Sequence, residues 1–235
     1  MISVVIPAHN EEALIGATLE ALTRGLRALG PPVPAFELIV VDDGSDDRTG
    51  EVARAAGARV VPVRLRQIAA ARNAGAAAAS GDMLIFVDAD TIVPEETLRA
   101  SVEAVAGGAV AGGAAAALPA SEARWAKAAW APFQWGMIVL RMPGGAFMFM
   151  TRAAFDAAGG FDERYFASEE IHVARALKKV GRFAMVRPRV ITSGRKFRLL
   201  GPKRMMREWL RLAVRGPAVL RNRKHLGLWY DRHRD

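Results

Sequence analysis

Four short apolar runs, each followed by polar residues, divide the first hundred positions of the chain. Continuous apolar runs of this length, bounded by turn residues, are typical of strands buried on both faces. The runs are Ile2–Pro7, Phe36–Val41, Val60–Val63 and Met83–Val87. Helical patterns follow each run and predict helices over residues 14–29, 49–56, 66–79 and 95–105. This alternation predicts a doubly wound α/β fold with a mainly parallel sheet.

The second half of the chain is less regular. Small residues over 110–118 predict a strand, and the run 144–150, entered through a pair of glycines, predicts another. A short helix is expected over 152–158, and a longer one begins after Ser168, which is a good N-cap residue. The aromatic residues within 125–135 are expected to pack in the core; lining of an acceptor pocket or a partner surface is the alternative.

The composition is that of a globular protein, with 51% hydrophobic and 24% charged residues among 235. The chain contains no cysteine, so disulfide bonds and thiol chemistry are excluded, which fits a reducing compartment. The chain enters an apolar strand at once, and we expect no secretory signal peptide. Neither 104–118 nor 137–150 offers the roughly 20 uninterrupted apolar residues that a membrane-spanning helix needs. We therefore expect a cytoplasmic protein.

The net charge of +9 is unevenly distributed. Residues 195–235 contain 13 Lys and Arg against three acidic residues, whereas the preceding 194 residues are nearly neutral. Residues 203–224 combine Trp and Met with arginines, as helices that bind anionic membrane surfaces do. We expect peripheral attachment to the inner membrane face through this segment; packing of the tail on the rest of the chain is the alternative. Nucleic acid is not expected as a partner, since no recognition motif accompanies the charge.

Polar residues follow three of the predicted strands, at positions 7–12, 42–46 and 88–90. The carboxyl ends of parallel strands meet at one edge of a sheet, where open α/β sheets bind ligands. Asp88 and Asp90 are typical ligands for a hard divalent cation, which in turn binds phosphate oxygens; capping of the next turn by Asp88 is the alternative. The first strand is not followed by G-x-G-x-x-G and the chain has no P-loop sequence, which argues against dinucleotide and P-loop folds.

Taken in order, the motifs resemble those of the family 2 glycosyltransferases. The matching segments lie within residues 1 to about 185 and are Val4–Glu12, Val41–Ser45, Ala71–Gly75, Gly81–Asp82, Asp88–Asp90, Gly144–Gly145, Gly159–Asp162 and Glu169–Glu170. The resemblance implies a GT-A fold, with a Rossmann-like, mainly parallel sheet flanked by helices. It also implies inverting transfer of a sugar from a nucleotide-diphosphate sugar to an acceptor hydroxyl, which we expect on a lipid-linked or cell-envelope molecule.

The resemblance also implies roles for individual residues. Asp43 would accept a hydrogen bond from the base, Asp88 would accept from the ribose, and Arg72 would lie near the base or the diphosphate. Asp90 would hold Mg²⁺ or Mn²⁺, which bridges the diphosphate and neutralises charge on the leaving group. The full set of residues expected against the donor is Pro7, Ala8, Glu11, Asp43, Arg72, Asp88 and Ala89.

The general base implied by the resemblance lies at a helix start. The family has Glu-Asp there, and this chain has Glu169-Glu170, so Glu170 takes the position of the base although its side chain is one methylene longer. Asp162 and Glu169 are the next candidates. The helix N-terminus is expected to lower the pKa of Glu170, and His172 on the same helix is expected to be structural or exposed. Arg195 and Lys196 are candidates for a cationic clamp over the diphosphate; plain solvated charge is the alternative.

The expected organisation is a catalytic domain over 1–194, with a nucleotide-binding half (1–100) and an acceptor-binding half (101–194), followed by a basic amphipathic helical tail over 195–235. Two other functions stay open. One is a catalytically degenerate module that binds nucleotide sugars. The other is a sugar-phosphate nucleotidyltransferase, which is opposed by the lack of a Gly-rich, Arg- or Lys-bearing loop after the first strand.

Overall fold

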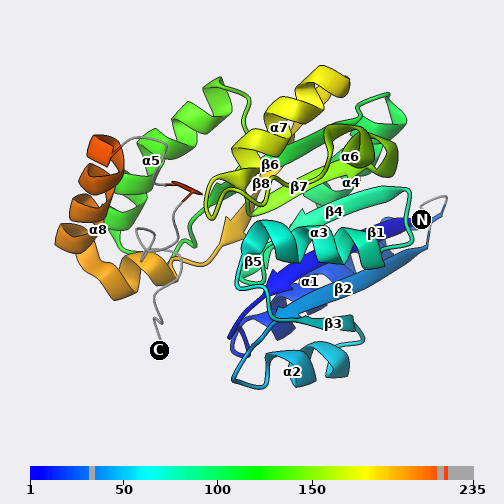
Figure 1. The fold of residues 1–235 in the computed structure, drawn as a ribbon, viewed down its shortest axis with the longest axis horizontal. Helices are drawn as coiled ribbons and strands as arrows, with labels where there is room; N and C mark the ends of the chain where they lie inside the picture. Colours follow the sequence, from blue (N-terminus) through cyan, green and yellow to red (C-terminus); the bar gives the residue numbers. More distant parts are fainter. Residues whose placement is uncertain (32–34, 216–219, 222–235) are drawn as a thin grey trace.

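The structure, a computed structural model, describes residues 1–31, 35–215 and 220–221 of the chain. Within these residues eight strands form one sheet, in the spatial order β3-β2-β1-β4-β7-β6-β8-β5 (Figure 1). The strands are β1 (Ile2–Ala8), β2 (Phe36–Asp43), β3 (Arg59–Val63), β4 (Met83–Val87), β5 (Thr91–Ile92), β6 (Ala111–Ala117), β7 (Phe147–Thr151) and β8 (Phe183–Thr192).

The first half of the sheet is parallel, as the alternation of apolar runs and helices predicts. β1 pairs in parallel with β2 and β4, and β2 pairs in parallel with β3. β7 is antiparallel to both of its neighbours, and β5 is antiparallel to β8. The predicted α/β sheet is confirmed, and it is mixed in its second half. Sequence reasoning missed β5, which has two residues, and β8, whose pattern is interrupted by the exposed residues Arg187, Pro188 and Arg189.

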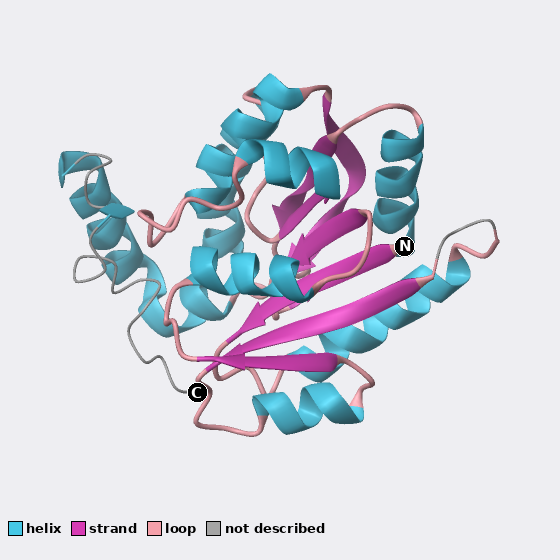
Figure 2. Cartoon of the chain, turned by 45° about the vertical axis from the view of Figure 1, so that its right-hand side comes forward, coloured by secondary structure: helices cyan, strands magenta, loops and turns pink. Residues whose placement is uncertain are grey.

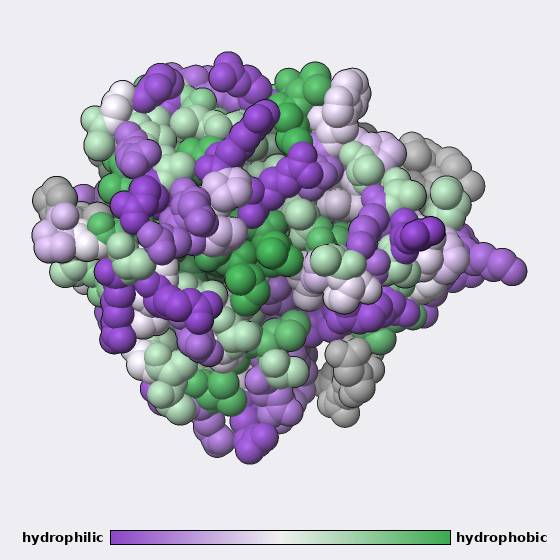
Figure 3. All heavy atoms as spheres, turned by 180° about the vertical axis from the view of Figure 1, so that it is seen from behind, coloured by the Kyte–Doolittle hydropathy of each residue, from purple (hydrophilic) through white to green (hydrophobic). Residues whose placement is uncertain are grey.

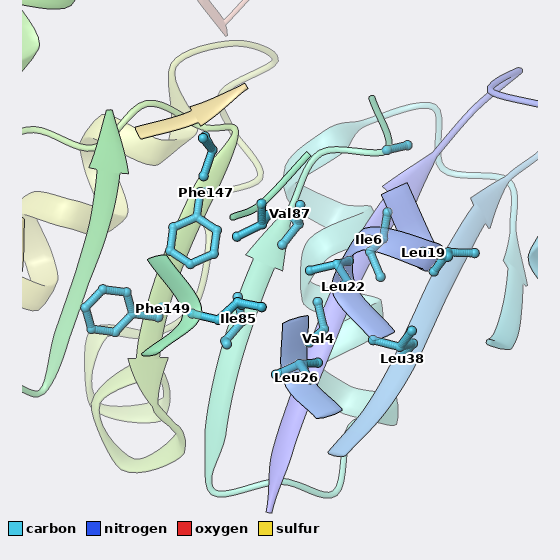
Figure 4. Packing of buried hydrophobic residues seen from close by; sticks show 14 of the residues in the cluster. Val4, Ile6, Leu19, Leu22, Leu26, Leu38, Ile85, Val87, Phe147 and Phe149 are labelled. Carbon is cyan, nitrogen blue, oxygen red and sulfur yellow. The ribbon is translucent and has the colours of Figure 1, made fainter. Parts of the chain in front are cut away.

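Helices cover both faces of the sheet (Figure 2). α1 (Ile15–Ala28), α2 (Thr49–Ala55) and α4 (Glu95–Ala106) pack on one face, and α3 (Ile68–Ala78), α6 (Arg152–Ala158) and α7 (Glu169–Val180) pack on the other. Leu19, Leu22 and Leu26 of α1 pack in one cluster with apolar residues of β1, β2 and β4 (Figure 4). Each of these leucines is at most 3% exposed, and full burial of such a side chain contributes about 1.5–3 kcal/mol. Seen from behind, the surface is mainly hydrophilic, with apolar side chains gathered near its centre (Figure 3).

The remaining two helices, α5 (Arg124–Val139) and α8 (Arg195–Arg215), pack on each other beside the sheet (Figure 1). Phe197 of α8 lies between Trp125 and Trp130 of α5, with ring centroids 5.9 and 6.0 Å apart. Met205 of α8 is buried in the same apolar cluster. The aromatic residues of α5 thus pack in the core in part, and the first turns of the basic tail pack on the body of the protein.

α8 bends at Gly201, whose φ of 63° is readily adopted only by glycine, and Pro202 follows. The side chains of residues 208–215, and all of 216–219 and 222–235, lie outside the described residues, so within 203–224 only the side chains of 203–207 and 220–221 are described. None of the described helices is long and apolar enough to cross a membrane.

Candidate functional site

The loop after β1 is fixed against the loop after β2 by hydrogen bonds. The Asn10 amide donates to Ser45 Oγ (3.1 Å), and Asn10 Oδ1 accepts from the Asp46 amide (2.8 Å). The Glu11 amide donates to Thr49 Oγ1 (2.8 Å). Asn10 has a φ of 56°, a left-handed conformation that asparagine tolerates better than most residues. Two of the three predicted strand-end segments therefore form one connected unit at the carboxyl edge of the sheet.

Asp43, the residue expected to contact the base, holds the loop that precedes α3. Its Oδ1 accepts from the amides of Leu65 (2.6 Å) and Arg66 (2.8 Å), and its Oδ2 accepts from the amide of Gln67 (3.1 Å). The carboxylate is 6% exposed. Arg66 in turn contacts the ring of His9, whose pKa is lowered by burial and by the positive charge of Arg66. Asp43 therefore fixes the loop over residues 65–67, which contacts His9, the residue after β1, through Arg66.

Asp88 follows β4 directly. Its amide donates to Ala146 O (3.2 Å), and its Oδ1 accepts from Arg72 Nη2 (2.8 Å). The side chain is 31% exposed. Burial raises the pKa of Asp88 to about 6, against the opposing effect of the Arg72 charge. The next residue, Ala89, is buried, and its carbonyl accepts from the Thr18 hydroxyl (2.8 Å), which ties the strand end to α1.

Asp90 meets two hydroxyl groups that the sequence did not single out. Its Oδ2 accepts from Ser193 Oγ (2.6 Å), and its Oδ1 lies 3.4 Å from Thr192 Oγ1. The pairing of β5 with β8 brings these residues together, because Thr91 lies opposite Thr192. Carboxylate and hydroxyl oxygens suit Mg²⁺ or Mn²⁺. Among the described residues no cluster of three His, Cys, Asp or Glu side chains could hold a metal ion, so the other ligands would have to come from phosphate and water.

Arg72 is buried beneath the site and joins three segments of it. Its side chain is 1% exposed. Nη1 pairs with Glu169 at the start of α7, and Nη2 donates to Asp88 and to Gly145 O (2.9 Å). Its Nε has no hydrogen-bond partner among the described residues, and its guanidinium carbon lies 5.2 Å from the centre of the Phe161 ring. Arg72 therefore lies below the surface, where it links the end of β4, the segment before β7 and the start of α7.

Glu170 lies at the start of α7, close to the backbone of Gly145. A Cβ added to Gly145 would lie 3.5 Å from Glu170 Cδ, so glycine leaves the carboxylate its space. Burial, and then the neighbouring Glu169, raise the pKa of Glu170 to about 8. The expected lowering by the helix N-terminus is wrong, because desolvation and like charge outweigh the helix amides here. Ser168 occupies the N-cap position but makes no capping hydrogen bond through its side chain.

The other two candidate bases are engaged in ion pairs. Arg164 bonds to Asp162 and lowers the pKa of Asp162 to about 2. Glu169 is paired with Arg72. Of the three acids, only Glu170 has no ion pair with a described residue. His172 stacks on the ring of Tyr165 with centroids 3.6 Å apart, which agrees with a structural role.

The segment after β8 folds back over this edge of the sheet through two ion pairs. Arg195 donates to Glu11 (Nη1 to Oε2, 2.9 Å), and burial raises the pKa of Glu11 against the opposing effect of Arg195. Arg198 pairs with Glu122, whose side chain is 3% exposed and lies against Gly194. Sequence reasoning missed Glu122, although it is the only acidic residue between Glu103 and Asp156. The Lys196 side chain lies outside the described residues.

Residues 220–221 contact the loop that precedes α7. The Phe166 amide donates to Leu220 O (2.8 Å), and Arg221 Nη2 donates to the Tyr165 hydroxyl (2.6 Å). The Arg221 guanidinium also lies 4.8 Å from the centre of the Tyr165 ring. The described end of the tail therefore reaches the side of the site where Glu170 lies.

The chain is similar in sequence to known proteins. The family model described as Glycosyl transferase family 2 matches residues 3–155. An undecaprenyl-phosphate 4-deoxy-4-formamido-L-arabinose transferase from Pseudomonas paraeruginosa is 41% identical over an alignment of 115 residues, which covers 46% of this chain and 33% of that protein. This chain thus matches about a third of the length of that relative.

Two solved structures are similar in fold. The mannosyltransferase PcManGT from Pyrobaculum calidifontis, in complex with GDP-Man and Mn²⁺, has a TM-score of 0.63 at 21% identity over 90% of this chain and 64% of that one. S. aureus TarS in complex with UDP-GlcNAc has a TM-score of 0.62 at 18% identity over 82% of this chain and 58% of that one. At these identities the likeness shows the fold.

Proposed function

This chain belongs to glycosyl transferase family 2, and on that premise we propose that it moves a sugar from a nucleotide-diphosphate sugar to a lipid-linked or cell-envelope acceptor, with inversion. One observation carries the proposal: Arg72 joins Asp88, at the end of β4, to Glu169, at the start of α7. The acids that suit a sugar donor and the acid that suits a base therefore share one edge of the sheet.

The donor half of the proposed site is the edge formed by the loops after β1, β2 and β4. The base and ribose lie against Pro7, Ala8, Asp43 and Asp88. Asp90 and the Ser193 hydroxyl would hold Mg²⁺ or Mn²⁺, and the bound ion would supply positive charge to balance the departing diphosphate. The complex of PcManGT with GDP-Man and Mn²⁺ supports this arrangement by analogy.

Arg72 acts in this proposal as a positioning residue. Its single guanidinium fixes Asp88 on the donor side and, through Glu169, the start of the helix that carries Glu170. Glu11 and Arg195 form a pair next to the same edge, and we propose that Arg195 moves from Glu11 to the diphosphate when the donor binds. Its guanidinium would then balance phosphate charge.

Glu170 is the proposed general base when the acceptor is a hydroxyl. The acceptor oxygen attacks the anomeric carbon, the bond from that carbon to the diphosphate breaks, and the hydroxyl proton moves to Glu170. A base with a pKa of about 8 is stronger than an ordinary carboxylate, but only its ionised fraction can act. The rate of transfer to a hydroxyl should therefore rise with pH.

A second candidate acceptor is the phosphate of a lipid phosphate, and the raised pKa of Glu170 favours it. At neutral pH a carboxyl group with a pKa of about 8 is mostly protonated, so it can donate a hydrogen bond to a phosphate without charge repulsion. A phosphate oxygen is already ionised and needs no base. The relative from Pseudomonas paraeruginosa is named for an undecaprenyl-phosphate transferase, which agrees with such an acceptor. We further propose a location at the cytoplasmic membrane face.

The test of turnover is a panel of nucleotide sugars incubated with the protein and Mn²⁺, with release of nucleoside diphosphate as the readout. Turnover of at least one donor is expected. The absence both of turnover and of metal-dependent donor binding would sink the enzyme proposal, and binding without turnover would support the degenerate module.

Two substitutions assign the roles. Asp90→Asn should abolish the Mn²⁺-dependent part of nucleoside diphosphate binding in calorimetry, whereas Glu96→Gln, an exposed carboxylate on α4, should not. Glu170→Gln should retain donor binding and lose roughly 10²–10⁴ in transfer to a hydroxyl acceptor. Retained transfer to a lipid phosphate by Glu170→Gln would favour the phosphate acceptor, and retained transfer to a hydroxyl would assign the base elsewhere.

A further inference from the structure

α5 carries an apolar stripe that faces solvent. Trp135, Val139 and Leu140 are 70%, 56% and 67% exposed, whereas Ala126 and Met137 on the opposite side of the helix are buried. Trp135 and Val139 lie one helical turn apart, so they project from the same side. Exposed smaller side chains extend this stripe toward the start of the helix: Ala128, Ala131 and Pro132. A large apolar group of this kind marks an interaction surface.

Basic residues border the stripe, and acidic residues are missing from it. Residues 123–141 contain three basic residues and no Asp or Glu. At the C-terminal end of α5, Lys178 Nζ lies 3.3 Å from Leu140 O. Burial lowers the pKa of Lys178, and the nearby charges of Arg141 and Arg175 lower it further. These three cations are exposed, and within the described part of the chain none of them forms an ion pair.

α5 leads directly into the candidate active site. Gly145 lies five positions after Leu140; its carbonyl accepts from Arg72, and its Cα lies beside Glu170. Five residues of chain span at most about 18 Å. The stripe therefore ends within that distance of Gly145, which lies beside the acid that we propose to act on the acceptor.

We infer that the exposed face of α5 binds an anionic phospholipid bilayer. Trp135, Val139 and Leu140 enter the headgroup region, and Arg141, Arg175 and Lys178 lie against the lipid phosphates. Charge favours a membrane over a second copy of this chain as the partner. An anionic surface complements the basic border, whereas the same face of a second copy would place its own cations against it. Tryptophan beside aliphatic residues, with Lys and Arg around them, is typical of helices that lie in the membrane interface.

This surface differs from the one that the sequence predicts. At the start of the tail segment 203–224, Lys203 and Arg204 are exposed. Met205 is buried in the apolar cluster against α5 and does not face solvent. The described apolar side chains that face solvent in this region are mostly those of α5. The biological purpose of this surface rests on the proposed function, since membrane binding would bring lipid-linked acceptors to the site. Membrane binding itself is measured without any donor.

The test is sedimentation of the full chain with vesicles of phosphatidylcholine and phosphatidylglycerol (about 3:1), with pure phosphatidylcholine vesicles in parallel. The key variant replaces the stripe (Trp135→Ser, Val139→Ser, Leu140→Ser). The matched control replaces two other exposed apolar residues (Leu65→Ser, Ile191→Ser), which are 47% and 40% exposed. A third variant changes the tail (Lys203→Gln, Arg204→Gln). Circular dichroism checks that each variant folds.

The wild type should sediment with the mixed vesicles and much less with pure phosphatidylcholine. The stripe variant should lose roughly tenfold or more in partition coefficient, because the apolar surface that would leave water is gone, while the control keeps its binding. No binding by the wild type, equal binding by the stripe variant, or a loss confined to the tail variant would each overturn the inference. So would a wild-type dimer that the stripe variant abolishes without any vesicle binding. Vesicle binding without donor turnover would refute the proposed function and leave this surface intact.

Discussion

Arg72→Met should be one of the most destabilising single changes in this protein. The substitution keeps much of the volume of the side chain but removes the charge from a site that is 1% exposed. It leaves Glu169, itself 4% exposed, as a buried carboxylate without its partner, and it removes hydrogen bonds to Asp88 and to Gly145 O. An uncompensated buried charge, more than the lost attraction, accounts for the expected loss.

The burial of the pair sets the magnitude. Removing one partner of a buried ion pair costs about 3–5 kcal/mol, against a total stability of about 5–15 kcal/mol for a domain. The exposed pair of Arg164 and Asp162 provides the comparison, because Arg164 is 74% exposed. Arg164→Met should therefore cost only about 0–1 kcal/mol.

Urea unfolding followed by circular dichroism measures both changes. The double variant Arg72→Met, Glu169→Gln should recover part of the loss, since a neutral amide replaces the buried carboxylate of Glu169. A cost of less than about 1 kcal/mol for Arg72→Met, or a double variant no more stable than the single one, would contradict the reasoning. If Arg72→Met does not fold, Arg72→Lys tests the geometry of the pair instead. An ammonium keeps the charge but cannot reach all three oxygens at once, so a smaller loss of stability than that of Arg72→Met is expected.

Three other predictions concern the pH dependence of transfer, the pH dependence of stability, and packing. Transfer to a hydroxyl acceptor should increase with pH up to about 8, and Glu170→Gln should lose this dependence in a pH–rate profile. Since the folded pKa of Glu170 is raised from 4.5, the wild type should lose stability relative to Glu170→Gln as pH rises from about 4.5 to about 8, by at most about 1.4 kcal/mol per pH unit. Gly75→Ala should cost about 1–3 kcal/mol in urea unfolding, because its Cβ would meet Val5 and lie 2.8 Å from Val41 Cγ2.

Each of these has a matched control. Glu96→Gln should leave both the pH–rate profile and the pH dependence of stability unchanged, since Glu96 is exposed; a flat wild-type profile would remove Glu170 as the base. Gly16→Ala should be neutral or stabilising, because its Cβ would lie at 3.5 Å from Val52, an ordinary contact in a helix. Equal costs at Gly16 and Gly75 would show that close packing is not the cause.

Local patterns in the sequence determined the order of the elements and the positions of the strand ends. Apolar runs such as Met83–Val87 predict buried strands. Parallel pairing of these strands then places Asp88 and Asp90 at the edge where open α/β sheets bind ligands. Helix and strand periodicity and chain direction suffice for this, because they depend on residues a few positions apart. The expected mainly parallel α/β fold followed from the same patterns.

Only the tertiary structure decided which charges meet and which stay open. Arg72 pairs with Glu169, 97 positions further along the chain. Ser193 donates to Asp90 over a separation of 103 positions, and Arg195 donates to Glu11 over 184. The pKa of Glu170 moved opposite to the direction expected from its helix, because burial and a neighbouring carboxylate depend on the packed chain. Likewise, the apolar composition of α5 follows from the sequence, but the way α5 packs against the core and α8 determines that Trp135 is exposed to solvent. Burial and long-range electrostatics arise from the folded chain as a whole, so no local pattern encodes them.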